Sequence, residues 1–341
     1  MTGGVACATL LGLREQVVDF SEKLISTTPA VSDVNQYIGA LATAVMMLSY
    51  FNERALGSRF LARIEECSPS AIQNDPSTVG MIHYAMGRYA NIAEPEPYKV
   101  VEHYRAALVA VQEAGDRRGS VSVAGDLGLA LARLGADAEA EKVLRAGVAL
   151  SHRLKEPGMG VWSQMFLALV LACRADDAAC AEALRIGESL RDGVSEQTFY
   201  GAIVNCALSA AYLRTKNLTT AERCARSAVR AFQPLPTSAP LGLVLLIRVL
   251  LAQGQIEEAR QVATEGDQLL QSLNGAGSGE VPLRLAIADA YAAAGELAAA
   301  AEARAEAQLQ IERRAARIAD AEVRASYLLH VAPAQGPAPM I

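Results

Sequence analysis

A side chain that is usually small recurs near the start of a predicted helix, and this recurrence most restricts what the chain can fold into. It stands at Val100, Ala140, Cys180, Ala221, Ala259 and Ala300. A period of about 40 residues indicates an internal repeat. About twelve residues before each of these positions, an earlier helical segment carries an apolar residue and then a usually small one, as in Met86-Gly87 and Leu127-Gly128. Each repeat therefore predicts two helices, and the chain predicts an array of helical hairpins.

Glycines inside these predicted helices indicate close packing. Glycine costs on the order of 1 kcal/mol relative to alanine within a helix, and two helices whose axes approach to about 8–10 Å need a small side chain at their contact. We expect such contacts at Gly87, Gly128, Gly147, Gly187 and Gly266. A second set, Gly135, Gly254 and Gly295, is expected to end first helices in the left-handed conformation.

The spacing of Leu127, Gly128, Leu131, Ala140, Leu144 and Gly147 resembles the tetratricopeptide repeat. The resemblance covers residues 76–312. It departs from the family in its period of about 40 rather than about 34 residues, in Ile247 at a small position, in Arg304 at an apolar position, and in the missing helix-ending proline of the central repeats. The resemblance implies an all-α fold, a right-handed α-solenoid of stacked hairpins with six clear repeats and an open groove lined by the first helices.

The domain organisation predicted around this array has four parts. Residues 1–75 are expected to form one or two weaker hairpins, within 2–26 and 34–67, and residues 76–312 the solenoid. Residues 313–331 are expected to form a capping helix and 332–341 a disordered tail. The segments between hairpins, at 233–240 and 274–282 among others, are expected along one edge of the solenoid. The uncharged stretch 34–52 predicts a buried helix, with a membrane span as the alternative.

Charge and cysteine usage restrict the partners. The formal net charge is −6, whereas nucleic-acid binders gather Lys and Arg on one face, so no direct nucleic-acid partner is expected. No two of the six cysteines form a CxxC pair, and no basic residue precedes the apolar run near the N-terminus, as it would in a signal peptide. A reducing, cytoplasmic location without a membrane partner fits this pattern.

No set of catalytic residues can be assembled from the sequence. The four histidines form no metal-ligand spacing, the "GAGSGE" stretch at 275–280 lacks the Lys and Ser/Thr of a phosphate loop, and Asp176-Asp177 and Glu257-Glu258 are placed as helix-capping charges. Cys180, Cys206 and Cys224 are expected as small buried hydrophobes, with redox or metal use as the alternative. The sequence thus predicts a protein that is not an enzyme and has no cofactor and no metal.

One face of the first helices is the candidate binding surface. Helical spacing places on it Met81, Tyr84, Arg88, Arg133, Trp162, Met165, Leu169, Arg214 and Arg248. An apolar groove with spaced arginines suits an amphipathic or acidic peptide or helix. The alternative is that these residues pack against neighbouring first helices or a terminus.

The run "RRAARIADAEVRASYLLHV" at 313–331 resembles the closing segment of the repeat regions of large bacterial serine/threonine kinase or ATPase signalling regulators, and 114–147 resembles their interior. The resemblance implies a non-enzymatic protein-interaction scaffold or regulatory arm, either acting alone or belonging to a larger or split regulator. The alternative is a sensor for a small ligand or signalling peptide. Expected partners are a protein or peptide, a kinase or ATPase module, and a second copy of the chain.

Overall fold

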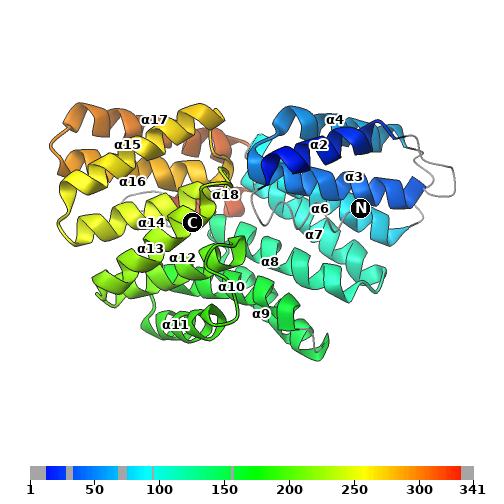
Figure 1. The fold of residues 1–341 in the computed structure, drawn as a ribbon, viewed down its shortest axis with the longest axis horizontal. Helices are drawn as coiled ribbons and strands as arrows, with labels where there is room; N and C mark the ends of the chain where they lie inside the picture. The colour runs from blue at the N-terminus through cyan, green and yellow to red at the C-terminus, as the bar shows by residue number, and fades with distance from the viewer. Residues whose placement is uncertain (1–12, 28–33, 68–74, 94–95, 155–156, 332–341) are drawn as a thin grey trace.

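The structure is a computed structural model that describes residues 13–27, 34–67, 75–93, 96–154 and 157–331. All regular secondary structure within these ranges is helical (Figure 1). The helices are α2 (Arg14–Ile25), α3 (Val34–Leu48), η2 (Ser49–Phe51), α4 (Arg54–Glu66), α6 (Pro76–Ala93), α7 (Pro97–Glu113), α8 (Arg117–Arg133), α9 (Asp137–Leu154), α10 (Pro157–Cys173), α11 (Asp177–Arg191), α12 (Phe199–Arg214), α13 (Leu218–Phe232), α14 (Ala239–Ala252), α15 (Ile256–Leu273), η3 (Gly277–Gly279), α16 (Glu280–Ala293), α17 (Leu297–Ala316) and α18 (Ala321–Val331).

Consecutive helices pair as the repeat predicts, so the all-α solenoid of stacked hairpins is confirmed. The six hairpins run from α6–α7 to α16–α17, and α3–α4 forms a further hairpin before them. Each recurring small position lies in the first turn of a second helix, as Ala140 does in α9. Of the predicted hairpin within 2–26, α2 is the described part. Residues 1–12, 68–74 and the tail 332–341 lie outside the described residues, and 313–316 continue α17.

The glycines lie where helices approach most closely. A Cβ added at Gly128 would be 2.3 Å from Leu144 Cγ of the paired helix, and one added at Gly87 would be 2.5 Å from Tyr104 Cε1. No side chain fits at such distances, so the small residues set the spacing of the hairpins. Gly135 ends α8 with φ of 76°, the left-handed conformation expected for a helix-ending glycine.

The stack curves until its two ends meet (Figure 1). The side chain of Asn52 donates to the carbonyl of Leu273, 221 residues away, at 3.1 Å. Arg54 donates to the carbonyl of Gly275 at 3.0 Å, and Thr237 Oγ1 donates to that of Tyr50 at 3.1 Å. We call this contact the closing seam: linkers 233–238 and 274–279 lie against η2, the start of α4 and the end of α6.

The seam is a feature that the repeat pattern did not predict. The linkers lie on one side of the array, and there they contact the N-terminal hairpin. The inner groove is bordered on one side by the seam, since Tyr50, Thr237 and Ser278 line its cavity; the rotation from each hairpin to the next accumulates over the array and brings them there. Helix α18 also leaves the stack, where Ser326 Oγ donates to the carbonyl of Gly135 at 3.3 Å.

Helix α3 is the buried helix predicted within 34–52, with Ile38 and Leu41 both fully buried. Among the described residues, no helix combines the length and the apolar character needed to cross a membrane.

Candidate functional site

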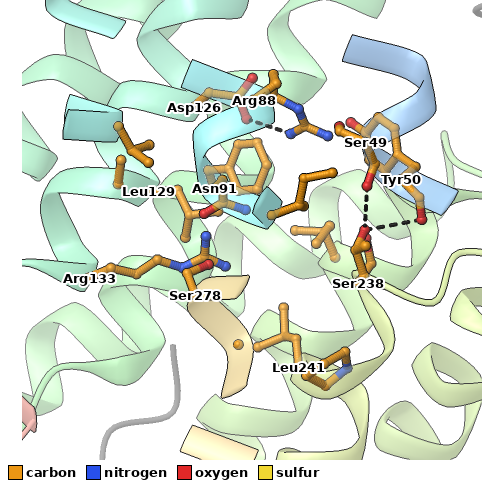
Figure 2. Close-up of a pocket in the computed structure, with 18 of the residues that line it drawn as sticks. Ser49, Tyr50, Arg88, Asn91, Asp126, Leu129, Arg133, Ser238, Leu241 and Ser278 are labelled. Carbon is orange, nitrogen blue, oxygen red and sulfur yellow. Dashed lines mark hydrogen bonds and ion pairs between the residues drawn. The ribbon is translucent and has the colours of Figure 1, made fainter. Parts of the chain in front are cut away.

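A cavity of about 80 Å³ lies inside the closed stack, between the first helices and the seam (Figure 2). Its apolar wall comes from helices α8, α10, α12 and α14, through Leu129, Phe166, Phe199, Ile203, Leu241 and Val244. A water molecule needs about 10–15 Å³ of such volume, so there is room for several waters. The cavity is too small, as it stands, for a peptide of several residues.

One side of the cavity carries a buried ion pair. Arg88 Nη1 lies 3.4 Å from Asp126 Oδ1, and the guanidinium carbon of Arg88 lies 4.2 Å from the ring centroid of Tyr50. Tyr84 Oη donates to the other oxygen of Asp126. Burial raises the pKa of the Asp126 carboxyl, while the charge of Arg88 and the hydrogen bond from Tyr84 act in the opposite direction. Burial also raises the pKa of Tyr50 to about 12, so its hydroxyl stays protonated at neutral pH.

Arg133, seven residues after Asp126 at the end of the same helix α8, also lines the cavity (Figure 2). Its Nε is shielded from solvent and has no hydrogen-bond partner, and no hydrogen bond or ion pair joins its side chain to any described residue. The pKa of Arg133 is lowered to about 10, chiefly by burial. Arg88 acts in the same direction, and Tyr104 and Asp126 act against it. The charged residues of the lining are Arg88, Asp126 and Arg133, so one positive charge has no counterpart among them.

Of the nine predicted groove residues, Arg88 and Arg133 line the cavity. Met165 and Leu169 are fully buried in the core. Met81, Trp162 and Tyr84 are partly buried and pack on that core. Arg214 lies outside the cavity and pairs with Asp177 at 2.9 Å, and Arg248 is a half-buried side chain of α14.

Trp162 packs against neighbouring first helices, which is the alternative to a binding role that the sequence left open for the predicted groove residues. Its indole nitrogen donates to the carbonyl of Ser122 in α8 at 3.1 Å. Its ring stacks on Phe199 with centroids 5.7 Å apart and meets Phe166 edge-on at 5.3 Å. Trp162 therefore supports the cavity wall from behind, because both phenylalanines line the cavity.

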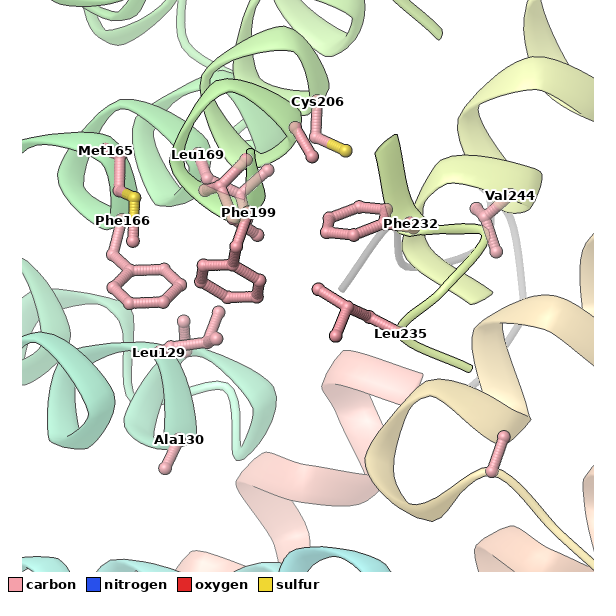
Figure 3. Packing of buried hydrophobic residues seen from close by; sticks show 14 of the residues in the cluster. Leu129, Ala130, Met165, Phe166, Leu169, Phe199, Cys206, Phe232, Leu235 and Val244 are labelled. Carbon is pink, nitrogen blue, oxygen red and sulfur yellow. The ribbon is translucent and has the colours of Figure 1, made fainter. Parts of the chain in front are cut away.

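Apolar side chains of the first helices and of the linker pack together on the inner side of the stack (Figure 3). Phe199 and Phe232 face each other with ring centroids 6.0 Å apart. Leu235, from the linker of the closing seam, points into the same cluster and is 1% exposed. The linker thus occupies part of the space that an open superhelix would leave to a ligand.

Several lining residues had no signal in the sequence. Tyr50, Asn91, Thr237 and Ser278 come from η2, the end of α6 and the two seam linkers. Asn91 lies in the first helix α6 but off the face chosen from helical spacing. The other three lie outside the paired helices, and only closure brings them beside the first helices. Asp126 lies within a predicted first helix but off the face chosen from helical spacing.

Among the described residues, no group of three or more His, Cys, Asp or Glu side chains could hold a metal ion. His83 and His103 approach each other, with their Nδ1 atoms 3.4 Å apart, but no third ligand joins them. The five described cysteines are free thiols. The cavity offers apolar contact, hydrogen bonding and one uncompensated cation, which is chemistry for binding.

Comparison with known proteins identifies the fold. No family model matches the chain, and no curated protein sequence matches it. The crystal structure of a Rap protein complexed with the competence and sporulation factor is similar with a TM-score of 0.63 and 13% identity, over 96% of this chain and 93% of that one. The structure of NprR in complex with its cognate peptide NprX is similar with a TM-score of 0.61 and 14% identity, over 96% and 95% of the two chains. The chain therefore has, over nearly its whole length, the tetratricopeptide-like helical-repeat fold that the Rap protein and NprR share.

Proposed function

We propose that this chain is a non-enzymatic regulator of a bacterial signalling system, which takes a short peptide into its interior cavity. The observation that carries the proposal is the cavity itself, because apolar side chains of four first helices form one wall and Arg133, whose side chain makes no hydrogen bond or ion pair with the described residues, also lines it. The fold supports it, since a Rap protein and NprR, which are similar along almost all of this chain, were each crystallised with a peptide or factor.

A peptide of several residues requires the cavity to widen. The closing seam is the part best placed to give way, because hydrogen bonds from Asn52 and Arg54 to linker carbonyls join its two sides. Hydrogen bonds of this kind contribute about 1 kcal/mol each, but the seam also buries Leu235 and packs Tyr50 on Phe199, so opening it requires a ligand that replaces these apolar contacts as well. Ligand binding would then change the pitch of the superhelix, and that change would be the regulatory signal.

A sensor of a small molecule is the second candidate, and the volume of about 80 Å³ favours it because a small ligand fits without opening the seam. An amphipathic or acidic segment of a larger protein belongs to the same class of partner as the peptide. A kinase or ATPase module controlled by this chain, a second copy of the chain as partner, and a cytoplasmic location remain predictions from the sequence.

The test is affinity selection. The protein is equilibrated with synthetic pools of five- to seven-residue peptides and with a metabolite panel, separated by gel filtration, and the retained molecules are identified by mass spectrometry. Leu129→Trp fills the cavity and should abolish retention. Leu297→Trp makes the same change at a side chain that is 71% exposed and should retain ligands as the wild type does.

Each outcome decides between the candidates. Retained peptides support the leading proposal, and retained metabolites support the sensor. If the wild type retains neither, or if Leu129→Trp retains the same ligands, the cavity is not the binding site. Thermal unfolding gives an independent measure, because ligand at 100 times its Kd stabilises the folded protein by about 2.7 kcal/mol.

A further inference from the structure

Arg133 differs from the other charged groups around the cavity because its side chain makes no hydrogen bond or ion pair with the described residues. Arg88 contacts the carboxylate of Asp126. Behind the seam, Arg314 and Arg284 share the carboxylate of Glu280, at 3.5 Å and 2.9 Å. Arg133 faces the cavity with no such partner.

A half-buried cation with a shielded, unpaired nitrogen is costly in the free protein. Burying a charge is compensated only when the group is paired and hydrogen-bonded, and the Nε of Arg133 is both shielded from solvent and unpaired. Neighbouring charges act in both directions, because Tyr104 and Asp126 favour the charged form of Arg133 while the guanidinium groups of Arg88 and Arg314 oppose it, so burial is the main cause of its lowered pKa. An anion placed in the cavity would remove this penalty and gain charge-assisted hydrogen bonds.

We propose that Arg133 binds a carboxylate group of the ligand, which in a peptide is the C-terminal carboxylate or the side chain of Asp or Glu. The inference rests on the proposed function, since it assigns the chemistry recognised in the same cavity. The planar guanidinium suits a carboxylate because two parallel N–H groups can donate to its two oxygens. The apolar wall at Leu129 and Ile203 would then hold a neighbouring apolar side chain of the same ligand.

Four peptide pools distinguish the two sources of the carboxylate. The pools combine a free or amidated C-terminus with the presence or absence of Asp and Glu, and retention is measured by gel filtration and mass spectrometry. The wild type should retain peptides from the pools that carry a carboxylate, and very little from the amidated pool without Asp and Glu. Whichever single-carboxylate pool is retained identifies the group that Arg133 binds.

Substitutions separate a binding role from a structural one. Arg133→Gln should lower the affinity for the retained peptides by about 10- to 100-fold, as expected for the loss of one charge-assisted interaction. Arg133→Lys should recover part of that affinity. The matched control is Arg214→Gln, which removes an arginine outside the cavity that is already paired with Asp177. Fluorescence of Trp162, the one tryptophan of the chain, reports the affinities because it stacks on the cavity-lining Phe199.

A measurement without ligand completes the test. Because Arg133 gains nothing from a partner in the free protein, Arg133→Gln should leave the melting temperature unchanged or raise it, whereas Arg88→Gln should lower it by leaving Asp126 buried without its cation. A loss of stability in Arg133→Gln equal to that in Arg88→Gln would overturn the proposal in favour of a structural role.

The remaining outcomes separate this inference from the function on which it rests. If the wild type retains peptides equally from all four pools, and Arg133→Gln does the same, peptide binding stands and the carboxylate site is wrong. If no pool is retained, both are wrong. If Arg133→Gln and Arg214→Gln lose affinity equally, the effect is general electrostatics and the assignment to Arg133 fails.

Discussion

Replacing Gly128 by alanine tests whether small residues set the spacing of the hairpins. The added Cβ would lie 2.3 Å from Cγ of Leu144, which is fully buried. Overpacking a close-packed interior costs about 1–3 kcal/mol, while glycine to alanine within a helix gains about 1 kcal/mol. The net change is a destabilisation of about 0–2 kcal/mol.

A matched control removes the uncertainty about helix propensity. Gly39 lies inside α3 and an added Cβ there meets nothing within 4 Å, so Gly39→Ala should gain about 1 kcal/mol. The two alanine variants should therefore differ by about 1–3 kcal/mol. For a chain of this length that corresponds to on the order of 1–4 °C in melting temperature, measured by calorimetry.

A second substitution makes the test specific to the contact. Leu144→Ala alone should cost about 2–5 kcal/mol by leaving a cavity. Combined with Gly128→Ala it should cost less than the sum of the two single changes, by about 0.5–3 kcal/mol, because the smaller side chain makes room for the new methyl group. The reasoning would be refuted if Gly128→Ala stabilised the protein as much as Gly39→Ala does, with no coupling to Leu144.

Three further predictions concern the seam and the buried charges. Gly277→Ala should increase the radius of gyration in small-angle X-ray scattering and lower the melting temperature more than Gly254→Ala does. Both glycines have positive φ, but only at Gly277 would the added Cβ meet backbone, 2.1 Å from the carbonyl oxygen of Asn91 in α6. Arg314→Met should lower the free energy of unfolding in urea by about 3 kcal/mol, since its guanidinium is buried between a carbonyl and a carboxylate of the seam. Burial lowers the pKa of both His83 and His103. Stability present above the unfolded-state pKa of about 6.5 should therefore be lost as pH falls through the folded-state pKa values. His83→Gln should flatten this dependence of the melting temperature on pH, and an unchanged slope would contradict the role given to His83.

The sequence by itself determined the hairpins, because each is a local arrangement. The two helices of a repeat follow one another directly, and the residues that join them, such as Gly128 and Leu144, are separated by less than one period. Helical periodicity, a glycine that reverses the chain and a small residue at the contact are all local requirements, so they leave a recurring trace in the chain. The same locality explains why Arg88 and Arg133 could be placed on an inner face.

The tertiary structure alone decided that the seam borders the groove and which arginine is left unpaired. Tyr50 meets Phe199 with ring centroids 5.2 Å apart, and Asn52 meets a carbonyl 221 residues away, although no motif links these positions. Closure follows from a small rotation repeated at every hairpin interface, and that sum is encoded in no single pair of residues. Arg214 and Arg133 occupy similar places in the sequence pattern, yet Arg214 has Asp177 as its partner while Arg133 faces the cavity. The difference arises because a partner's position depends on how neighbouring repeats pack, and the repeat register alone leaves that undetermined.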